Sequence, residues 1–167
     1  WVNSSAQVTL NDIRITGNSG ANGGGLGTGL FSTTTLNRVE ISGNNATNGG
    51  GVYAVGGTLT LNNTTVSGNS ATNNGGGIFA AAIFGSVSVN HTTVAANTAE
   101  SDGTGGGSGG GVFRSSNTFN FMNTIIAGNS VGTSGTNPDC SGSITSLDYN
   151  LIEDSTGCTI GGTTTNN

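Results

Sequence analysis

The chain contains no lysine, and its positive charge comes from Arg14, Arg38 and Arg114, set against eight acidic residues. Proteins that bind nucleic acid gain much of their affinity when lysine and arginine release counterions from phosphates. A chain with a formal net charge of −5 has almost no source for that release. The composition therefore excludes nucleic acid as a partner.

Long hydrophobic runs are missing as well. No apolar stretch approaches the roughly 20 residues of a membrane span, and nothing at the start resembles a signal peptide. We therefore expect no membrane insertion within this chain. Because the first residue is Trp1 rather than methionine, we also expect a processed chain or a fragment of a longer protein.

Charged residues make up only 7% of the chain and proline occurs once, whereas glycine occurs 32 times. Disordered chains are usually rich in charge and poor in β-branched residues. Here short runs of Val, Ile, Leu and Thr alternate with clusters of Gly and Asn, which is typical of short strands joined by many turns. We expect a single domain over residues 1–167.

A repeat runs through the whole chain. Five segments superpose, namely TLNDIRITGN (9–18), TLNRVEISGN (35–44), TLNNTTVSGN (60–69), SVNHTTVAAN (88–97) and FMNTIIAGN (121–129), and SLDYNLIED (146–154) is a degraded sixth copy. A hydrophobic anchor recurs every 25 to 32 residues, at Leu10, Leu36, Leu61, Val89, Phe121 and Leu147. This spacing is that of one rung of a solenoid.

Within each copy the apolar residues alternate as in a strand that bends once. A third short strand is expected after each run of three glycines, where the next residue is Leu26, Val52, Ile78 or Val112. Three short strands per repeat, stacked about 4.8 Å apart, describe a parallel β-helix. We predict an all-β solenoid of about six rungs with three short strands each.

The repeat resembles that of bacterial right-handed parallel β-helix proteins of the cell surface. The tail NTIIAGNSVGTSGTNPDCSGSITSLDYNLIEDSTGC (123–158) is similar to the C-terminal region of large secreted β-helix proteins in that group. The resemblance covers nearly the whole chain. It implies a right-handed solenoid with an extracellular or cell-surface location, in a group that includes adhesins and surface-layer components.

The glycine runs could be taken for loops that cradle a phosphate. A P-loop would be single, would carry a lysine and would open a helix. Here the runs recur once per rung, at residues 23–25, 49–51, 75–77 and 109–111. We interpret them as corners that use the conformational freedom of glycine and allow neighbouring rungs to approach.

Asparagines recur at two repeat positions, and we predict that each set stacks into a ladder of side-chain hydrogen bonds. One set is Asn11, Asn37, Asn62 and Asn90, and the other is Asn18, Asn44, Asn69, Asn97 and Asn129. Asn45 lies in an N-x-[ST] pattern outside both sets, in a stretch expected to be a loop. It is the expected glycosylation site, if any exists.

Cys140 and Cys158 could be free thiols, but each follows a comparable loop in the last two rungs. Both are expected at the third-strand position that Val112 holds one rung earlier, which would place their Cα atoms about 4.8 Å apart, within the range of a disulfide. We predict that they are bonded. A disulfide indicates an oxidising compartment.

The best-known enzymes on the β-helix fold are polysaccharide lyases and hydrolases, whose active sites resemble clusters of Asp with Lys, Arg or His. The single histidine of this chain, His91, shares its repeat position with residues of unrelated chemistry, namely Asp12, Arg38, Asn63, Asn123 and Tyr149. We therefore expect a solvent-facing position, no catalytic residue and no cofactor.

Four acidic residues crowd into the last rungs and could in principle ligate calcium, namely Asp139, Asp148, Glu153 and Asp154. We interpret them instead as a solvated acidic end and expect no metal. Near the other end, Asp12 with Arg38 and Arg14 with Glu40 are expected to form ion pairs across one rung spacing.

Three functions remain open. The first is a non-enzymatic extracellular structural solenoid. The second is an adhesin or carbohydrate-binding module that binds glycans, or a neighbouring subunit, through an outward strip formed by Tyr53, Phe79 and Phe113. The third is a degenerate polysaccharide lyase or hydrolase, which turnover of a uronic acid polymer would support.

The two ends of the predicted solenoid favour the first of these functions. WVNSSAQVTL runs straight into the first rung and CTIGGTTTNN follows the last, so neither end is expected to carry a cap. Stacking of one end on the other end of a second copy is a contact that does not close. We therefore expect the chain to bind itself, as a head-to-tail homopolymer that forms a surface filament.

Overall fold

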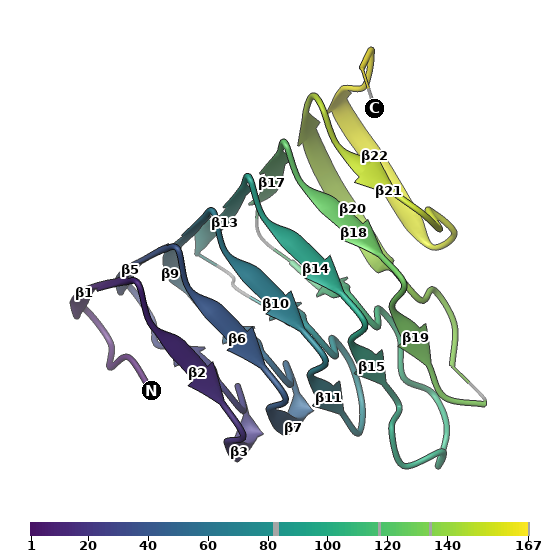
Figure 1. The fold of residues 1–167 in the computed structure, drawn as a ribbon, viewed down its shortest axis with the longest axis horizontal. Helices are drawn as coiled ribbons and strands as arrows, with labels where there is room; N and C mark the ends of the chain where they lie inside the picture. The colour runs from purple at the N-terminus through teal and green to yellow at the C-terminus, as the bar shows by residue number, and fades with distance from the viewer. Residues whose placement is uncertain (82–83, 117, 134, 167) are drawn as a thin grey trace.

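The computed structural model describes residues 1–81, 84–116, 118–133 and 135–166, and in this part of the chain it contains strands, turns and bends but no helix. The chain winds through successive coils, and parallel pairing joins each coil to the next (Figure 1). The fold is therefore an all-β parallel β-helix, as predicted. The described residues include no helical segment with the length and hydropathy of a membrane span.

The strands stack into four columns. The first column holds β1 (Gln7–Asn11), β5 (Thr33–Asn37), β9 (Gly57–Asn62), β13 (Gly85–Asn90), β17 (Thr118–Met122), β20 (Cys140–Leu147) and β22 (Cys158–Thr163). The second holds β2 (Arg14–Thr16), β6 (Glu40–Ser42), β10 (Thr65–Ser67), β14 (Thr93–Ala95), β18 (Ile125–Ala127) and β21 (Leu151–Ile152). The third holds β3 (Ser19–Asn22), β7 (Asn45–Asn48), β11 (Ser70–Ala71), β15 (Thr98–Ala99) and β19 (Ser130–Val131). The fourth holds β4 (Leu26–Thr28), β8 (Val52–Ala54), β12 (Ile78–Ala80), β16 (Val112–Arg114) and the start of β20.

The third column was not predicted, so the expectation of three strands per rung was wrong by one. Its strands are only two to four residues long and lie in stretches that were taken for polar loops. Their inward residues in the middle coils are the small side chains Ala46, Ala71 and Ala99. Alanine gives no strong alternation of hydropathy, so the strand period was not visible in the sequence.

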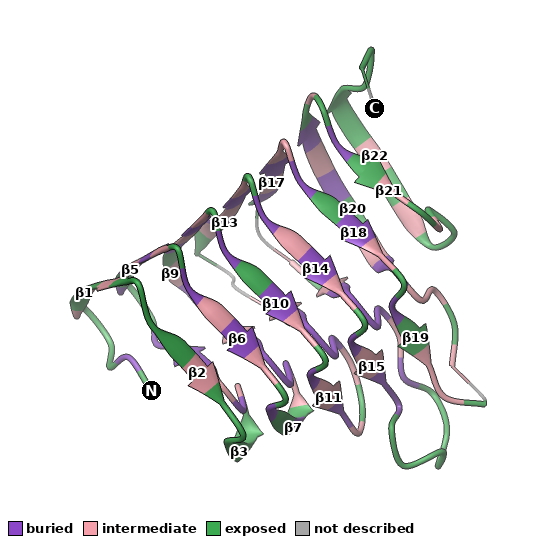
Figure 2. Cartoon of the chain, in the orientation of Figure 1, coloured by how far each residue is buried: buried purple, intermediate pink, exposed green. Residues whose placement is uncertain are grey.

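The core consists of like residues stacked on like. In the first column Leu36, Leu61, Val89 and Phe121 are in register and buried, and the second column repeats the pattern with Ile41, Val66, Val94 and Ile126. Each such side chain contributes roughly 1.5–3 kcal/mol when fully buried. Figure 2 shows buried residues in the middle strands and exposed or half-buried ones in β2 and β22.

The sixth repeat was aligned one residue out of phase. Ser146, not Leu147, pairs with Phe121 and is buried, whereas Leu147 is 45% exposed. The corner after it contains one extra residue, because Asp148 and Tyr149 both have positive φ where the earlier corners have one such residue. A slip of one residue exchanges the inner and outer faces of a strand.

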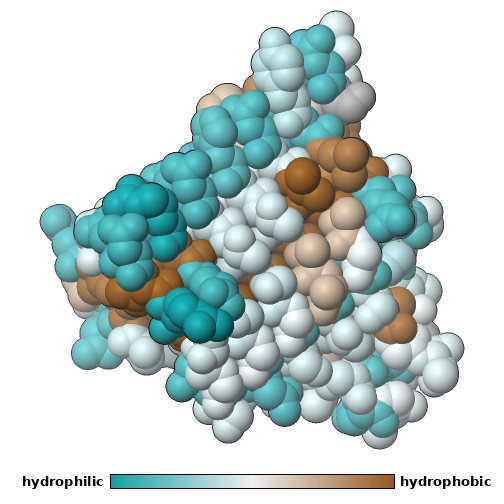
Figure 3. Space-filling view, viewed as in Figure 1, coloured by the Kyte–Doolittle hydropathy of each residue, from teal (hydrophilic) through white to brown (hydrophobic). Residues whose placement is uncertain are grey.

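The outer face of the second column changes in character along the solenoid. It begins with Arg14 and Glu40, continues with Thr65 and Thr93, and ends with exposed apolar residues, Ile125 and Leu151. Figure 3 shows this change as hydrophobic colour over β18 and β21. The C-terminal end of this face therefore exposes apolar surface.

Candidate functional site

The inner asparagine ladder, Asn18 to Asn129, is present as predicted. At each step the side-chain amide donates to the Oδ1 atom of the asparagine one coil later at 2.9–3.1 Å, and the backbone N–H donates to the same atom at 3.0 Å. The Nδ2 group of Asn97 donates in addition to the carbonyl of Val66 at 2.9 Å. Four of the five side chains are buried, and a buried amide without a hydrogen bond would destabilise the fold. The ladder bonds satisfy these amides.

The outer ladder is also present, and its bonds run in the opposite sense. Asn37 donates to Asn11 at 2.8 Å, Asn62 donates to Asn37 at 2.9 Å, and Asn90 donates to Asn62 at 3.1 Å. The next position in register is Met122, which cannot continue the ladder. The outer ladder is therefore more exposed and one step shorter than the inner one.

A third row of asparagines was missed by the sequence analysis. Asn48 donates to Asn22 at 3.3 Å, and the Oδ1 atom of Asn74 accepts from the backbone N–H of Ser108 at 2.9 Å. The backbone N–H of Asn74 donates to Asn48 at 3.4 Å. The signal that could have found this row is the asparagine that directly precedes three of the glycine runs.

Each glycine of a run has its own structural reason, and the third run is representative. Gly75 has a φ of 66°. A Cβ atom on Gly76 would lie 2.5 Å from the backbone of Thr98, and a Cβ atom on Gly77 would lie 3.0 Å from Nδ2 of Asn97. All three glycines are buried. Glycine is therefore required at these positions, because a side chain there would clash with the asparagine ladder or with the third column.

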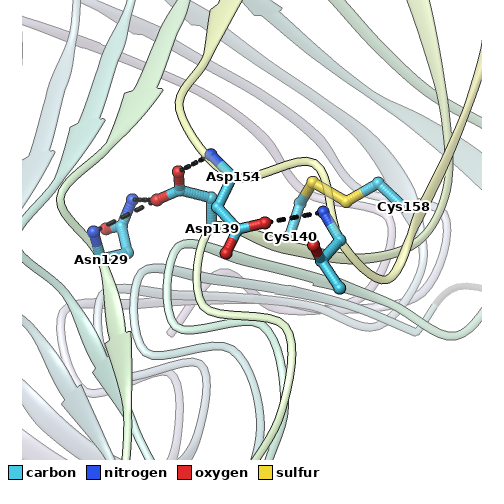
Figure 4. Close-up of a disulfide and its surroundings, with 6 residues drawn as sticks. Asn129, Asp139, Cys140, Asp154 and Cys158 are labelled. Carbon is cyan, nitrogen blue, oxygen red and sulfur yellow. Dashed lines mark hydrogen bonds between the residues drawn. A yellow bond between two sulfur atoms is a disulfide. The ribbon is translucent and has the colours of Figure 1, made fainter.

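Asp139 ends the inner ladder. It precedes Cys140, which pairs with Val112, and so stands where the earlier coils have the third glycine. Its Oδ1 atom accepts from the backbone N–H of Asn129 at 3.2 Å and from Nδ2 of Asn129 at 2.8 Å (Figure 4). A carboxylate can only accept, so it offers no donor to a further coil.

The second oxygen of Asp139 accepts from the backbone N–H of Asp154 at 2.8 Å. Ser155 lies three residues after Ile152, where the ladder would place its next asparagine. Because no asparagine side chain presses on position 139, a side chain fits there. The interpretation of Asp139 as part of a solvated acidic end was therefore wrong, since it is 1% exposed.

The other acids of this end bind separate partners. Glu153 accepts from the backbone N–H of Gly128 at 2.7 Å, Asp148 accepts from Asn166, and Asp154 accepts from the backbone N–H of Thr156 at 2.9 Å. The hydrogen bonds from Thr156 hold the pKa of Asp154 below its usual value. The described residues contain no group of three or more His, Cys, Asp or Glu that could hold a metal ion.

Cys140 and Cys158 form a disulfide, as predicted, with their Cα atoms 5.7 Å apart. Cys140 pairs with Val112, as predicted, but the predicted position of Cys158 was wrong by two residues, because Cys158 lies in register with Gly142 and not with Cys140. The bond therefore crosses diagonally from the start of β20 to the start of β22 (Figure 4). It ties the last strand to the coil beneath it.

Both predicted ion pairs are present. Arg38 forms two hydrogen bonds with Asp12 at 2.6 and 2.8 Å, and Arg14 binds Glu40 at 2.8 Å. The hydrogen bond from Arg38 lowers the pKa of Asp12, and hydrogen bonds from Ser42 and then Arg14 lower the pKa of Glu40. All four charged groups are solvent-accessible, so these pairs mainly help to fix register.

The aromatic residues Tyr53, Phe79 and Phe113 lie on successive strands of the fourth column, as predicted, and their rings form a stack called here the aromatic column. Their ring centroids are 5.0–5.1 Å apart and the planes differ by 12–14°. Trp1 continues the column beyond Tyr53, at 6.4 Å, and lies over Gly27, where a Cβ atom would overlap its indole ring. The rings therefore cover one another's faces, which are the surfaces that a sugar ring would stack on.

His91 lies at the corner between the first and second columns. Its Nε2 atom is 3.1 Å from Nδ2 of Asn123, and the described chain shows no carboxylate hydrogen-bonded to it. The corner residue of every coil has positive φ, between 49° and 56°, at Asp12, Arg38, Asn63, His91, Asn123 and Tyr149. The residues at this position share a left-handed backbone conformation and no side-chain chemistry. The residue types therefore gave no sign of this conformation in the sequence.

Asn45 is exposed and lies outside the three rows of asparagines, as predicted, but not in a loop. It is the first residue of β7 and pairs with Ser19 and Ser70 in the third column. The short third column, which the sequence did not reveal, is the reason for this error.

The two ends of the solenoid expose the core. At the N-terminal end Val8, Leu10 and Ile15 are only partly buried. At the C-terminal end a cavity of about 720 Å³ is lined by Ile152 and Ile160, which are partly buried and pack against the core, and by Ile125, Tyr149, Leu151 and several polar residues. Among the described strands, β22 pairs with β20 alone.

Both ends of the solenoid are therefore candidate interaction surfaces. No family model, curated protein or solved structure is similar enough to the chain to count as a match.

Proposed function

We propose that this protein is a non-enzymatic extracellular structural β-solenoid whose copies stack head to tail into a surface filament. The observation that carries the proposal is the apolar cavity at the C-terminal end, together with the half-buried core residues at the N-terminal end. Apolar surface of this kind marks interaction sites. The free strand edges beside it can pair with a further parallel strand.

The register supports a head-to-tail contact. If β1 of one copy extends the first column beyond β22 of another, Val8 follows Ile160 in register. The second column ends one coil earlier, at β21, so β2 of the second copy does not pair with it. Asp139 closes the inner ladder within each copy, so the contact rests on strand edges and core residues rather than on asparagines. The first column holds seven strands, so β1 of the next copy follows after seven strand spacings, which gives a repeat of about 34 Å along the filament.

The other parts of the proposal have separate support. The disulfide is compatible with an oxidising compartment, and the sequence resembles cell-surface β-helix proteins. His91 is bonded to an amide, and the acids of the C-terminal end bind separate groups. The aromatic column offers ring edges rather than faces, which favours a structural protein over a carbohydrate-binding module.

The test is the molar mass of the non-reduced chain, measured by light scattering from micromolar to millimolar concentration. We expect the mass to grow with concentration. Val8→Asp and Ile160→Asp each block one end, so each variant alone should stay monomeric, and an equimolar mixture should form dimers and nothing larger. Thr65→Asp, on the outer face of β10, should polymerise like the parent chain. A parent chain that is monomeric throughout contradicts the proposal.

A further inference from the structure

The outer face of the first column is an uncharged array of hydroxyl groups. The strands of this column, all of which the structure describes, contain no charged residue. Their outward side chains form three rows that run from coil to coil, and the third of these is the outer asparagine ladder. The first row is Gln7, Thr33, Thr58, Ser86, Thr118, Ser143 and Thr159, and the second is Thr9, Thr35, Thr60, Ser88, Asn120, Thr145 and Gly161. These two rows, which are threonine or serine except at Gln7, Asn120 and Gly161, form the hydroxyl face.

The hydroxyl groups of this face lie at the surface. Thr33 and Thr58 are exposed, and Thr60 is half-buried. None of the hydroxyls in the two rows forms a side-chain hydrogen bond with another described residue. A threonine at a corner behaves differently, since Thr64 donates to the carbonyl of Asn62 at 3.1 Å. The hydroxyl face therefore keeps its donors and acceptors for an external ligand.

The array is regular in two directions. Neighbouring strands of a sheet lie about 4.8 Å apart, and alternate residues of one strand lie about 6.7 Å apart. The pairing from β1 to β13 continues in register without a bulge. Sheets stay flat where ladders of side chains oppose their twist, and the outer asparagine ladder runs directly beside the two rows. The hydroxyl face is therefore a flat, rectangular array.

We propose that the hydroxyl face binds ice. In the surface planes of hexagonal ice, water oxygens repeat at two spacings close to those of the array. A threonine hydroxyl both donates and accepts hydrogen bonds, as each water of the lattice does, so an array in register with the lattice binds many waters at once. A sugar ring would stack on an aromatic side chain, and the described strands of this column turn none outward. The rows lie within one chain, so this activity requires no self-assembly.

The test measures two properties of ice in solutions of the intact, non-reduced chain. In a nanolitre osmometer the parent chain should hold an ice crystal without growth below its melting point, over a temperature gap that widens with protein concentration. When an ice front grows slowly through the solution, the parent chain should enter the ice and leave the liquid. A parent chain that produces no gap and stays in the liquid overturns the proposal, even if it binds a polysaccharide.

Two matched variants assign the activity to this face. Thr60→Lys places a long, charged side chain in the second row, and Thr65→Lys makes the same change in the same coil on the outer face of β10. Because the lattice contacts act together, Thr60→Lys should reduce the temperature gap by at least about tenfold, whereas Thr65→Lys should retain it. Circular dichroism checks that both variants are folded, and Thr58→Lys, at an exposed position of the first row, replaces Thr60→Lys if that variant does not fold. Equal activity of a folded hydroxyl-face variant and of Thr65→Lys would overturn the assignment.

Discussion

In the first four coils the third glycine of each run faces an asparagine of the following coil, whereas after β19 Asp139 stands in place of that glycine and Ser155 takes the next ladder position. The same fold therefore uses two residue patterns. The repeated one lets coils be added without limit, because each ladder asparagine both donates and accepts. The terminal one stops this series with an acceptor and a disulfide, while strand edges and core residues stay open.

The largest effect is expected where a methyl group meets backbone. Gly50→Ala places Cβ 2.3 Å from the carbonyl oxygen of Ser70 and 2.6 Å from that of Gly76, so the free energy of unfolding should fall by about 3 kcal/mol or more. Gly68→Ala is the matched control, because its Cβ meets nothing within 4 Å although φ is 61°. It should cost about 1–2 kcal/mol. Urea unfolding curves measure both, and similar losses in the two variants would contradict this packing argument.

Substitutions in the middle of the inner asparagine ladder should destabilise the fold more than substitutions at its end. Asn97→Asp keeps the acceptor but removes the donor that binds Asn129 and Val66, and should destabilise by about 3 kcal/mol. Asp139→Asn exchanges the same two groups at the end of the ladder, keeps an acceptor for Asn129 and loses one bond to Asp154, so about 1 kcal/mol is expected. Thermal unfolding at pH 7 should show this order. The reverse order would show that Asp139 does not end the ladder in the way described.

The disulfide should act locally. Cys158→Ser removes a cross-link that spans 18 residues, and the loss should be about 2–3 kcal/mol. Because the bond joins β20 and β22, amides of β22 should exchange faster while those of β9 stay protected. A uniform loss of protection along all columns would mean that the last coil does not open separately.

The smallest effect concerns the ion pairs of the first coils. The lowered pKa of Asp12 means that its pair with Arg38 stabilises the fold above the ordinary aspartate range and loses this contribution as pH falls through the lowered value. Arg38→Ala should raise the titration midpoint of Asp12 towards the ordinary value of an aspartate. NMR titration of the side-chain carboxyl measures this midpoint. An unchanged midpoint in the variant would exclude Arg38 as the cause.

Much of this architecture follows from the sequence. The 25–32-residue repeat predicted the stacked strands, and equal spacing predicted both asparagine ladders and the two ion pairs. The third column stayed hidden because Ala71 and Ala99 carry too little hydropathy to reveal a strand. The sequence alignment placed Ser146 one residue out of register, because the corner that follows it contains one extra residue. The burial of Asp139 and Glu100 depends on what other coils place beside them, which no local pattern contains.

Hydrogen exchange at two protein concentrations tests the central claim most directly. The account predicts that peptides covering β1 and β22 gain protection as the concentration rises, because these strands carry the free edges that pair between copies. A peptide covering β9, which is paired on both sides within one chain, should not change. Protection of β1 and β22 that is independent of concentration would contradict head-to-tail assembly.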